Sequence, residues 1–245
     1  MTHGSVPVQA QLPIALVVAT GHEAQIVDRA LRATNVTDRF RLRFEVVQVG
    51  VGCAELDSKR LVETCGAIVS TGFAGALAPH IRSGTLLLPE KIKNTHNTVY
   101  GVDTDVQQMI GKNAQTDIAP SAIVKGPLLH TDKLLATVSQ KQHAYENSRC
   151  IACDMESATL AAVAEQGGLP FACLRIVLDP AHMIIPDPIV QLAELEREPT
   201  ATEFLTAVSR HPAQLAATAA FLWHTFKASR ALSRSVKMLA EGCSK

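Results

Sequence analysis

Short apolar runs recur along the chain, separated by stretches that are polar or amphipathic. Apolar runs bounded by Gly, Pro or polar clusters are typical of buried strands, and longer stretches of helix-forming residues are typical of helices. The predicted strands are 12–19, 42–50, 67–70, 84–89, 121–125 and 171–178. The predicted helices are 22–32, 54–65, 131–145 and 159–166. Because strands and helices alternate, the pattern predicts an α/β fold.

Three segments depart from this alternation. Residues 1–11 show no periodicity, which predicts a flexible tail ahead of a single domain over 12–245. Residues 182–199 contain prolines and an acidic run, which predicts a long loop or lid with a short helix. The polar stretch 91–117 predicts loop and a short helix.

The pattern becomes helical again over 212–240, with two opposite sides. The apolar side carries Phe221, Leu222, Ala228, Leu232, Val236 and Leu239. The basic side carries Lys227, Arg230, Arg234 and Lys237, together with Trp223. Such a stripe is usually a solvated face, but a basic helix with a Trp also resembles an interfacial membrane anchor. Both interpretations stay open.

Composition limits the class of protein further. The chain has 245 residues, of which 47% are hydrophobic and 19% charged, and its net charge is zero, so no global field points to nucleic acid. No apolar run reaches the ~18 residues that span a bilayer. Six cysteines suggest reduced thiols in a cytoplasmic protein. The C-x-x-C spacing of Cys150 and Cys153 has no second pair nearby, and we expect neither a metal nor a cofactor.

The most informative stretch is 153–158, which contains two acidic residues ahead of a helix. After that helix and a Gly-Gly break comes the buried strand 171–178, which ends on Asp179. A helix N-terminus beside the carboxyl end of a strand would bring Glu156 and Asp179 to one edge of the sheet, where ligands bind in open α/β folds. Two carboxylates there can hold hydroxyls and deliver a proton. An aspartate before a proline is also an ordinary turn, and the pattern alone leaves these two interpretations even.

Asp-Met-Glu-Ser-Ala at 154–158, followed by a strand ending in Asp, resembles the nucleoside phosphorylase and methylthioadenosine/S-adenosylhomocysteine nucleosidase superfamily. Further matching segments are 15–19 with Glu23, Gly50-Val51-Gly52, and 70–77. The chain is most similar to the hopanoid-associated group, whose members remove adenine from adenosylhopane. That similarity rests on Gly126-Pro127-Leu128-Leu129, on Asp179-Pro180-Ala181 and on the long C-terminal extension.

The resemblance implies a single-domain, three-layer α/β sandwich with a central mixed, partly barrel-like sheet flanked by helices. It implies cleavage of the N-ribosidic bond of an adenosine-type nucleoside with a bulky apolar 5′-substituent, and a homodimer or larger homo-oligomer. The alternatives are a methylthioadenosine/S-adenosylhomocysteine nucleosidase or a phosphate-dependent nucleoside phosphorylase. From another class, the chain could be a catalytically silent nucleoside-binding protein, with Leu178 as a sign of decay.

The resemblance also assigns roles to the acidic residues. Asp179 would be the general acid that protonates the departing base, since a carboxyl after an apolar strand is expected to have a raised pKa. Glu23 would orient the attacking water, although a glutamate in the first turn of a helix also complements the helix dipole. Glu156 would accept hydrogen bonds from the ribose hydroxyls as positive charge builds on the sugar. Met155 would pack on the sugar or simply belong to the core.

The purine pocket is less well specified. Small residues at 71–75 predict a loop with exposed amides that suit an anion or a sugar face, including Gly72. Related nucleosidases stack a phenylalanine on the adenine, and here Leu129 stands near that place, so aliphatic contact or Phe73 would hold the base. His130 is either a polar contact or, more often in such places, a helix-start or surface residue.

The nucleophile is predicted to be water. Phosphorolytic relatives carry an arginine just before the loop at 71–75, where this chain has Ser70-Thr71. A phosphate dianion is poorly held without a bidentate guanidinium. Arg175, in the middle of a predicted strand, needs a buried partner, for which Asp154 is a candidate, and Asp154 also suits the N-cap of the following helix.

Overall fold

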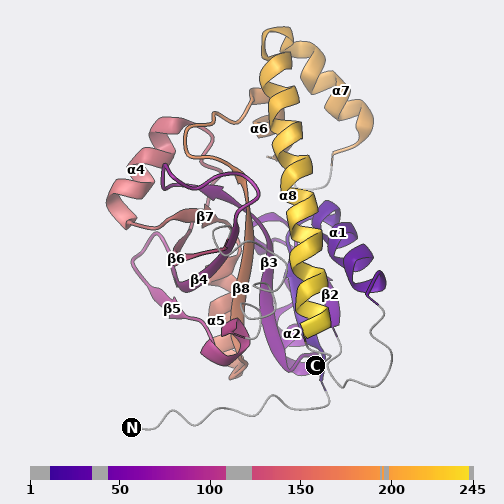
Figure 1. Ribbon diagram of the computed structural model, residues 1–245, viewed down its shortest axis with the longest axis vertical. Coiled ribbons are helices and arrows are strands. Elements are labelled where there is room, and N and C mark those ends of the chain that lie inside the picture. The colour runs from indigo at the N-terminus through magenta and orange to yellow at the C-terminus, as the bar shows by residue number, and fades with distance from the viewer. Residues whose placement is uncertain (1–11, 35–43, 109–122, 194, 196–198, 243–245) are drawn as a thin grey trace.

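The computed structural model describes residues 12–34, 44–108, 123–193, 195 and 199–242 (Figure 1). The strands are β1 (Ile14–Val18), β2 (Phe44–Gln48), β3 (Ala67–Ala76), β4 (Leu86–Lys93), β5 (Val99–Gly101), β6 (Ile123–His130), β7 (Ala152–Asp154) and β8 (Phe171–Asp179). The helices are α1 (Gly21–Arg32), α2 (Ser58–Thr64), α4 (Val138–Ser148), α5 (Ser157–Gly167), α6 (Asp187–Ala193), α7 (Ala201–Arg210) and α8 (Leu215–Gly242). Two short 3₁₀ turns are η1 (Val51–Cys53) and η3 (Pro212–Gln214).

The described strands form one mixed sheet that curls partly into a barrel. β2, β1 and β3 are parallel neighbours at the open side of the sheet. Beyond them, β3 pairs with β8, β8 with β4, β4 with β6, β6 with β7, and β7 returns to β3. This closed ring confirms the predicted barrel-like sheet.

Helices cover both faces of the sheet. The side chains of β1 alternate between two cores, because successive residues of a strand point to opposite faces. Ala15 and Val17 pack in the core that contains residues of α2 and α5, whereas Leu16 packs in the core beneath α1 and α8. Figure 1 shows α8 running along the sheet beside α1. The result is the predicted three-layer sandwich.

The unit around α5 and β8 agrees with its prediction. α5 ends on Gly167, and Gly168 adopts a left-handed conformation with φ of 64°, which suits a glycine at a helix end. β8 then begins at Phe171 and is buried along nearly all of its length.

Two predictions elsewhere are wrong. Residues 71–75 are not a loop, because β3 continues through them, paired with β8 and β7.

The predicted helix 131–145 is also wrong in its start. Residues 131–136 form a loop, and α4 begins only at Val138, where Thr137 and Gln140 form a capping box that fixes the first turn. Similarly, the stretch 91–117 contains more strand than expected, because β4 extends to Lys93 and pairs with β5. Residues 109–117 and the tail 1–11 lie outside the described residues.

The C-terminal extension is the helix α8, and its apolar side is the one that meets the sheet. Ala228, Leu232 and Val236 are fully buried there. Leu222 is an exception to the prediction, because its side chain is 44% exposed. It precedes the exposed Trp223 in the N-terminal half of α8. None of the described helices combines the length and the hydropathy that crossing a bilayer requires.

Candidate active site

Four acidic side chains line one cavity of about 220 Å³. They are Glu23 in the first turn of α1, Asp154 at the end of β7, Glu156 before α5, and Asp179 at the end of β8. A cavity of similar size between β2 and α2 contains none of the predicted site residues. The cavity with the four carboxylates is therefore the candidate site.

Glu156 and Asp179 meet at this cavity, as the sequence predicted. β7 ends beside β3, so the chain turns into α5 with Glu156 at its N-cap position. Asp179 is the last residue of β8 and lies opposite Gly75 of β3. A Cβ atom at Gly75 would lie 3.2 Å from Asp179 Oδ2, so the small residue leaves room for the carboxylate.

Glu156 is buried and held on both oxygens. The Gly52 N–H donates to Glu156 Oε1 at 3.0 Å, and Arg175 Nη2 lies 3.5 Å from Glu156 Oε2. Gly52 can present its N–H because it adopts φ of 64°, which is unfavourable for residues with a side chain. Burial raises the pKa of Glu156 to about 7, with nearby Asp154 and Glu23 adding to the shift and Arg175 opposing it. The backbone of the segment Gly50-Val51-Gly52 thus approaches Glu156 closely.

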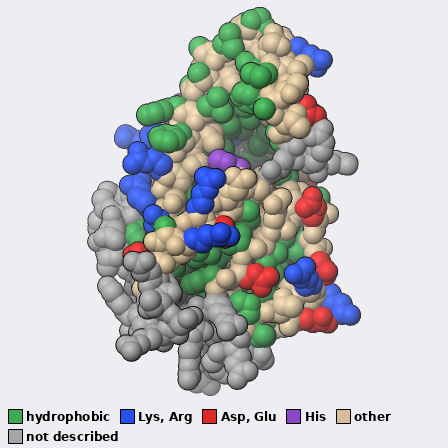
Figure 2. All heavy atoms as spheres, turned by 90° about the vertical axis from the view of Figure 1, so that its right-hand side faces the viewer, with side chains coloured by type: hydrophobic (Ala, Val, Ile, Leu, Met, Phe, Trp, Pro, Cys, Tyr) green, Lys and Arg blue, Asp and Glu red, His purple; other side chains and the backbone are tan. Residues whose placement is uncertain are grey.

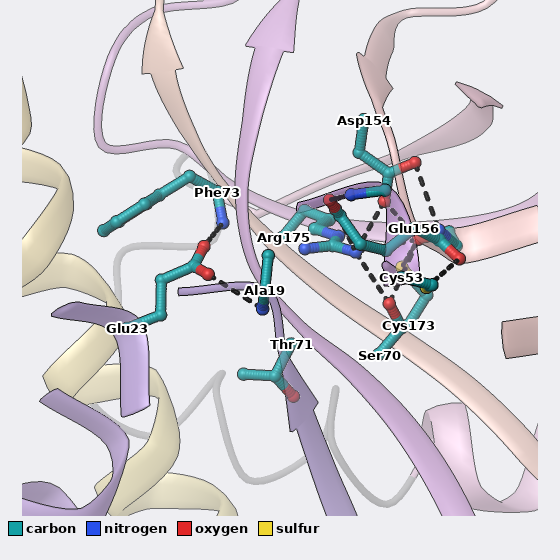
Figure 3. A network of polar contacts seen from close by, with 12 residues as sticks. Ala19, Glu23, Cys53, Ser70, Thr71, Phe73, Asp154, Glu156, Cys173 and Arg175 are labelled. Carbon is teal, nitrogen blue, oxygen red and sulfur yellow. Dashed lines mark hydrogen bonds and ion pairs between the residues drawn. The ribbon is translucent and has the colours of Figure 1, made fainter. Parts of the chain in front are cut away.

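Glu23 is held by the backbone of two elements. Its Oε2 accepts hydrogen bonds from the N–H groups of Ala19 and Thr20, both at 3.0 Å, in a capping box that starts α1. Its Oε1 accepts from the Phe73 N–H of β3 at 2.8 Å. The same carboxylate therefore caps the helix and lines the cavity (Figure 3).

Arg175 is a fully buried cation between these carboxylates. Figure 3 shows Glu23 on one side of it and Asp154 and Glu156 on the other. Its Nη2 lies 2.6 Å from Asp154 Oδ2, which confirms the predicted partner. It also donates to Ser70 Oγ at 2.7 Å. Ser70 stands where phosphorolytic relatives are expected to carry an arginine.

The prediction that Asp154 caps α5 is wrong. Glu156 holds the N-cap position, and Asp154 accepts only a long bond of 3.4 Å from the Ser157 N–H. Its other oxygen is committed to Arg175 and to the Ser157 hydroxyl. A buried guanidinium requires a charged partner more strongly than a helix end requires a cap.

Asp179 lies against a lysine that sequence reasoning missed. Lys141 Nζ of α4 is 2.5 Å from Asp179 Oδ2, and the lysine side chain is only 1% exposed. Burial raises the pKa of Asp179, while the charge of Lys141 and, more weakly, that of His224 oppose the shift. Nothing in the polar sequence of α4 signals that its single lysine is buried.

The predicted sugar and base contacts are only partly brought together. Phe73 and Met155 line the cavity, and both are half-buried. Gly72 does not line it but lies behind it, packed against the side chains of Glu23 and Arg175. The apolar wall instead includes side chains from the loop before α4 and from β8, namely Leu134, Leu135 and Leu178.

Leu129 and His130, at the end of β6, are not among the lining residues. Leu129 packs in a small core cluster with Leu77, Cys150 and Cys153. The interpretation of His130 as a surface residue is wrong, because it is buried at the end of β6, and this burial lowers its pKa. Within the described residues, no group of three or more His, Cys, Asp or Glu side chains is arranged to hold a metal ion.

The family model for the phosphorylase superfamily matches residues 13–217. The chain belongs to this superfamily. The predicted superfamily and the predicted class of enzyme, a nucleosidase or nucleoside phosphorylase, are thereby confirmed. A comparison of the sequence with curated proteins gave no match.

Solved structures show the same fold at low sequence identity. Futalosine hydrolase of Helicobacter pylori is 12% identical, with 94% of this chain and 98% of that chain covered and a TM-score of 0.65. The 5′-methylthioadenosine/S-adenosylhomocysteine nucleosidase of Neisseria meningitidis, in complex with methylthio-immucillin-A, is 15% identical, with 92% and 98% covered and a TM-score of 0.63. A Helicobacter pylori nucleosidase of the same kind is 14% identical, with 84% and 100% covered and a TM-score of 0.62. These similarities confirm the predicted fold class.

Proposed function

We propose that this protein hydrolyses the N-ribosidic bond of an adenosine-type nucleoside that carries a bulky apolar 5′-substituent, as adenosylhopane does, and so releases adenine in hopanoid biosynthesis. The observation that carries the proposal is the set of four carboxylates around one cavity, whose lining contains no Lys or Arg among the described residues. Such a site suits a reaction in which positive charge develops on the substrate.

The proposed reaction divides the work among three carboxyl groups. The bond between C1′ and the base nitrogen breaks, its electron pair passes to the base, and protonated Asp179 gives its proton to a ring nitrogen of that base. The sugar becomes oxocarbenium-like, as in glycoside hydrolysis, and anionic Glu156 accepts hydrogen bonds from its hydroxyls. Water held by Glu23 then adds to C1′, and Glu23 accepts the proton that the water loses.

The charges around the cavity favour water over phosphate as the nucleophile. Neither of the two buried cations beside the site lines the cavity: Arg175 lies against Asp154, and Lys141 lies against Asp179. A phosphate dianion in the cavity would lie among carboxyl groups, because no Lys or Arg of the described residues lines the cavity. Desolvating a dianion without a compensating charge is strongly unfavourable.

The apolar 5′-substituent is supported by the apolar wall of the cavity, which includes Leu134, Leu135 and Leu178. Figure 2 shows hydrophobic side chains gathered above a hollow in the face formed by α8 and its neighbours. The exposed apolar side chains of α7 and α8 include Leu205, Leu215, Trp223 and Phe226. A substrate tail of hydrocarbon would gain contact area there.

The test measures adenine release from adenosine, from 5′-methylthioadenosine and from an adenosine with a long 5′-alkyl group, each with and without phosphate. We expect the highest kcat/KM for the alkyl substrate, with free ribosyl product and no requirement for phosphate. A ribosyl phosphate product would contradict hydrolysis, and preference for methylthioadenosine would contradict the apolar tail. Tight binding without turnover of any substrate would indicate a nucleoside-binding protein.

The basic side of α8 is proposed to touch an anionic membrane surface at the inner face, where a hopanoid-linked substrate would reside. Lys227, Arg230 and Arg234 are exposed, and Trp223 stacks on the neighbouring Phe226. An interfacial helix needs both basic and aromatic groups of this kind. The cytoplasmic location and the homo-oligomer stay predictions.

Co-sedimentation with vesicles that contain anionic lipid tests the membrane contact. High salt should weaken binding of the wild type to the vesicles. Replacing Lys227, Arg230, Arg234 and Lys237 by Gln should abolish that binding. The matched control removes four other basic side chains, Arg29, Arg32, Lys59 and Arg60, which are exposed on α1 and α2. Equal binding by both variants would end this proposal.

A further inference from the structure

Lys141 is a buried cation that the proposed reaction does not yet use. It lies in α4, a largely polar helix, yet its side chain is only 1% exposed. Its ammonium group faces three oxygens: Asp179 Oδ2 at 2.5 Å, the Met183 carbonyl at 2.7 Å and the Pro180 carbonyl at 3.2 Å. A lysine is rarely buried unless it is paired, and here the ammonium donates to two carbonyls and forms an ion pair with Asp179. The ammonium is therefore fixed in one position.

Lys141 contacts the carboxyl group of Asp179 from outside the cavity. Asp179 lines the cavity, whereas Lys141 does not. The lysine can thus act on a bound nucleoside only through Asp179. It also ties the turn after β8 to α4, because it binds carbonyls at both ends of the segment 180–183.

The residue before Asp179 cannot orient the Asp179 carboxyl by a hydrogen bond, so a group from another element has to do so. Leu178 carries no hydrogen-bonding group that could orient the carboxyl, and its side chain forms part of the apolar wall. The other titratable groups near Asp179 are Cys153 of β7 and His224 of α8. His224 affects the pKa of Asp179 less than Lys141 does. Lys141 is the principal charge on this carboxyl.

We propose that Lys141 is a positioning residue for the acid of the reaction: it orients the Asp179 carboxyl toward the leaving base and stabilises the carboxylate that forms when the proton is transferred. The inference rests on the proposed function. As the C1′–N bond breaks, the proton moves from Asp179 to the base, and negative charge develops beside the ammonium. The lysine keeps its own proton throughout, so it is not consumed and needs no co-reactant.

This role has a signature that a purely structural role lacks. Burial raises the pKa of Asp179 and Lys141 opposes this, so the uncharged Lys141→Gln variant should hold the proton more tightly. The falling limb of the kcat/KM profile, where Asp179 loses its proton, should then move to higher pH by about 1 unit or more. At the same time the plateau should fall about 100-fold, since the acid is weaker and less well oriented.

The experiment compares the wild type with Lys141→Gln, Lys141→Arg and the exposed control Lys133→Gln. Adenine release is followed from pH 4 to 10 with the alkyl substrate. The pKa of Asp179 is measured by carboxyl ¹³C NMR and assigned with Asp179→Asn. In Lys141→Gln we expect the shifted pH profile of adenine release and the raised Asp179 pKa by NMR. In Lys141→Arg the Asp179 pKa should stay within about 0.5 unit, because the positive charge is retained. The control Lys133→Gln should match the wild type in both measurements.

An unchanged NMR pKa of Asp179 in Lys141→Gln, or a lower plateau with an unmoved limb, would overturn the inference. If Lys141→Gln does not fold, Lys141→Arg decides, because a shift of its Asp179 pKa by more than about 1 unit would contradict a role for the charge. If the wild type releases no adenine, the proposed function fails. The NMR comparison still decides whether Lys141 controls the protonation of Asp179.

Discussion

The two carboxylates paired with Arg175, Asp154 and Glu156, differ in how much of their charge remains available to a ligand. Asp154 lies 2.6 Å from the guanidinium and accepts the Ser157 hydroxyl as well. Glu156 lies farther away, at 3.5 Å, and among the described residues its other oxygen accepts a hydrogen bond only from the Gly52 N–H. Since each carboxylate oxygen has two lone pairs, Glu156 retains acceptor capacity toward the cavity. It is therefore the carboxylate best placed to hold hydroxyls.

Replacing Glu156 by Gln should weaken the transition state more than the ground state. The variant keeps the shape and the bond from Gly52 but loses the charge, and a hydrogen bond to a charged group contributes about 1.5–3 kcal/mol. We expect kcat/KM for the ribonucleoside to fall by about 30-fold or more. Steady-state adenine release checks this.

The matched substrate for that test is the 2′-deoxy nucleoside, which lacks one of the two hydroxyls. If Glu156 binds the hydroxyls, the variant should lose only about 5-fold on the deoxy substrate. Equal losses on both substrates would show that Glu156 acts elsewhere. Glu165→Gln, exposed on α5, is the control variant and should leave both rates unchanged.

The raised pKa of Glu156 also predicts how stability depends on pH. A carboxyl whose pKa rises on folding, here to about 7, favours the folded state at low pH, and this contribution is lost as the pH rises through the folded value. Glu156→Gln cannot titrate. Relative to the wild type, its free energy of unfolding should therefore gain about 1–3 kcal/mol between pH 5 and pH 8.

Urea unfolding at several pH values measures this difference directly. The stability curve of Glu165→Gln should run parallel to that of the wild type. Parallel curves for Glu156→Gln as well would mean that burial does not penalise the charge of Glu156.

At the scale of the element, β3 connects the capping of α1 to the cavity. Its residue Phe73 donates to Glu23, and the glycine before it lets the side chains of Glu23 and Arg175 approach the strand. A Cβ atom at Gly72 would lie closer to Glu23 Oε1 and to Arg175 Nη1 than van der Waals contact permits. The small residues of this strand therefore make room for charged side chains.

Gly72→Ala should thus damage both stability and activity. Forcing a methyl group into a packed site costs about 1–3 kcal/mol, and the displaced Glu23 would no longer hold the water. We expect a lower midpoint of thermal unfolding and a kcat/KM lower by about 10-fold or more. The control is Gly101→Ala in β5, where an added Cβ meets nothing within 4 Å. Similar effects of the two substitutions would contradict the packing argument.

The same strand shows where local patterns stop being informative. The unit of α5, Gly168 and β8 was predictable, because its signals are local: a helix-forming run, a left-handed glycine and an apolar strand. The small residues after Ser70 predicted a loop, and this prediction failed. These residues are kept extended by pairing with β7 and β8, which are distant in sequence and leave no local signal.

Lys141 illustrates the same limit within the site. The acidic residues could be inferred because each follows a recognisable element or motif. A lysine in a polar helix carries no such signal, and only the packing of α4 against the turn after β8 places it at Asp179. The predicted helix 131–145 does contain Lys141, but its polar residues give no sign of which side is buried.

At the scale of the whole molecule, α8 belongs to the core although most of it lies beyond the family match, which ends at residue 217. Its buried face packs on α1 and β8 and completes the core that contains Leu16 and Leu174. β8 in turn ends at Asp179. The extension therefore supports the strand that carries the proposed acid.

Two leucines of α8 allow this dependence to be measured. Leu232 is fully buried, whereas Leu222 is 44% exposed on the same helix. Leu232→Ala removes the same atoms as Leu222→Ala but leaves a cavity between α8 and the sheet, which costs about 2–5 kcal/mol. Urea unfolding should show that loss for Leu232→Ala and a change within about 0.5 kcal/mol for Leu222→Ala. Equal, small losses would show that α8 is only loosely attached and that the domain is held together by the sheet and the helices before it.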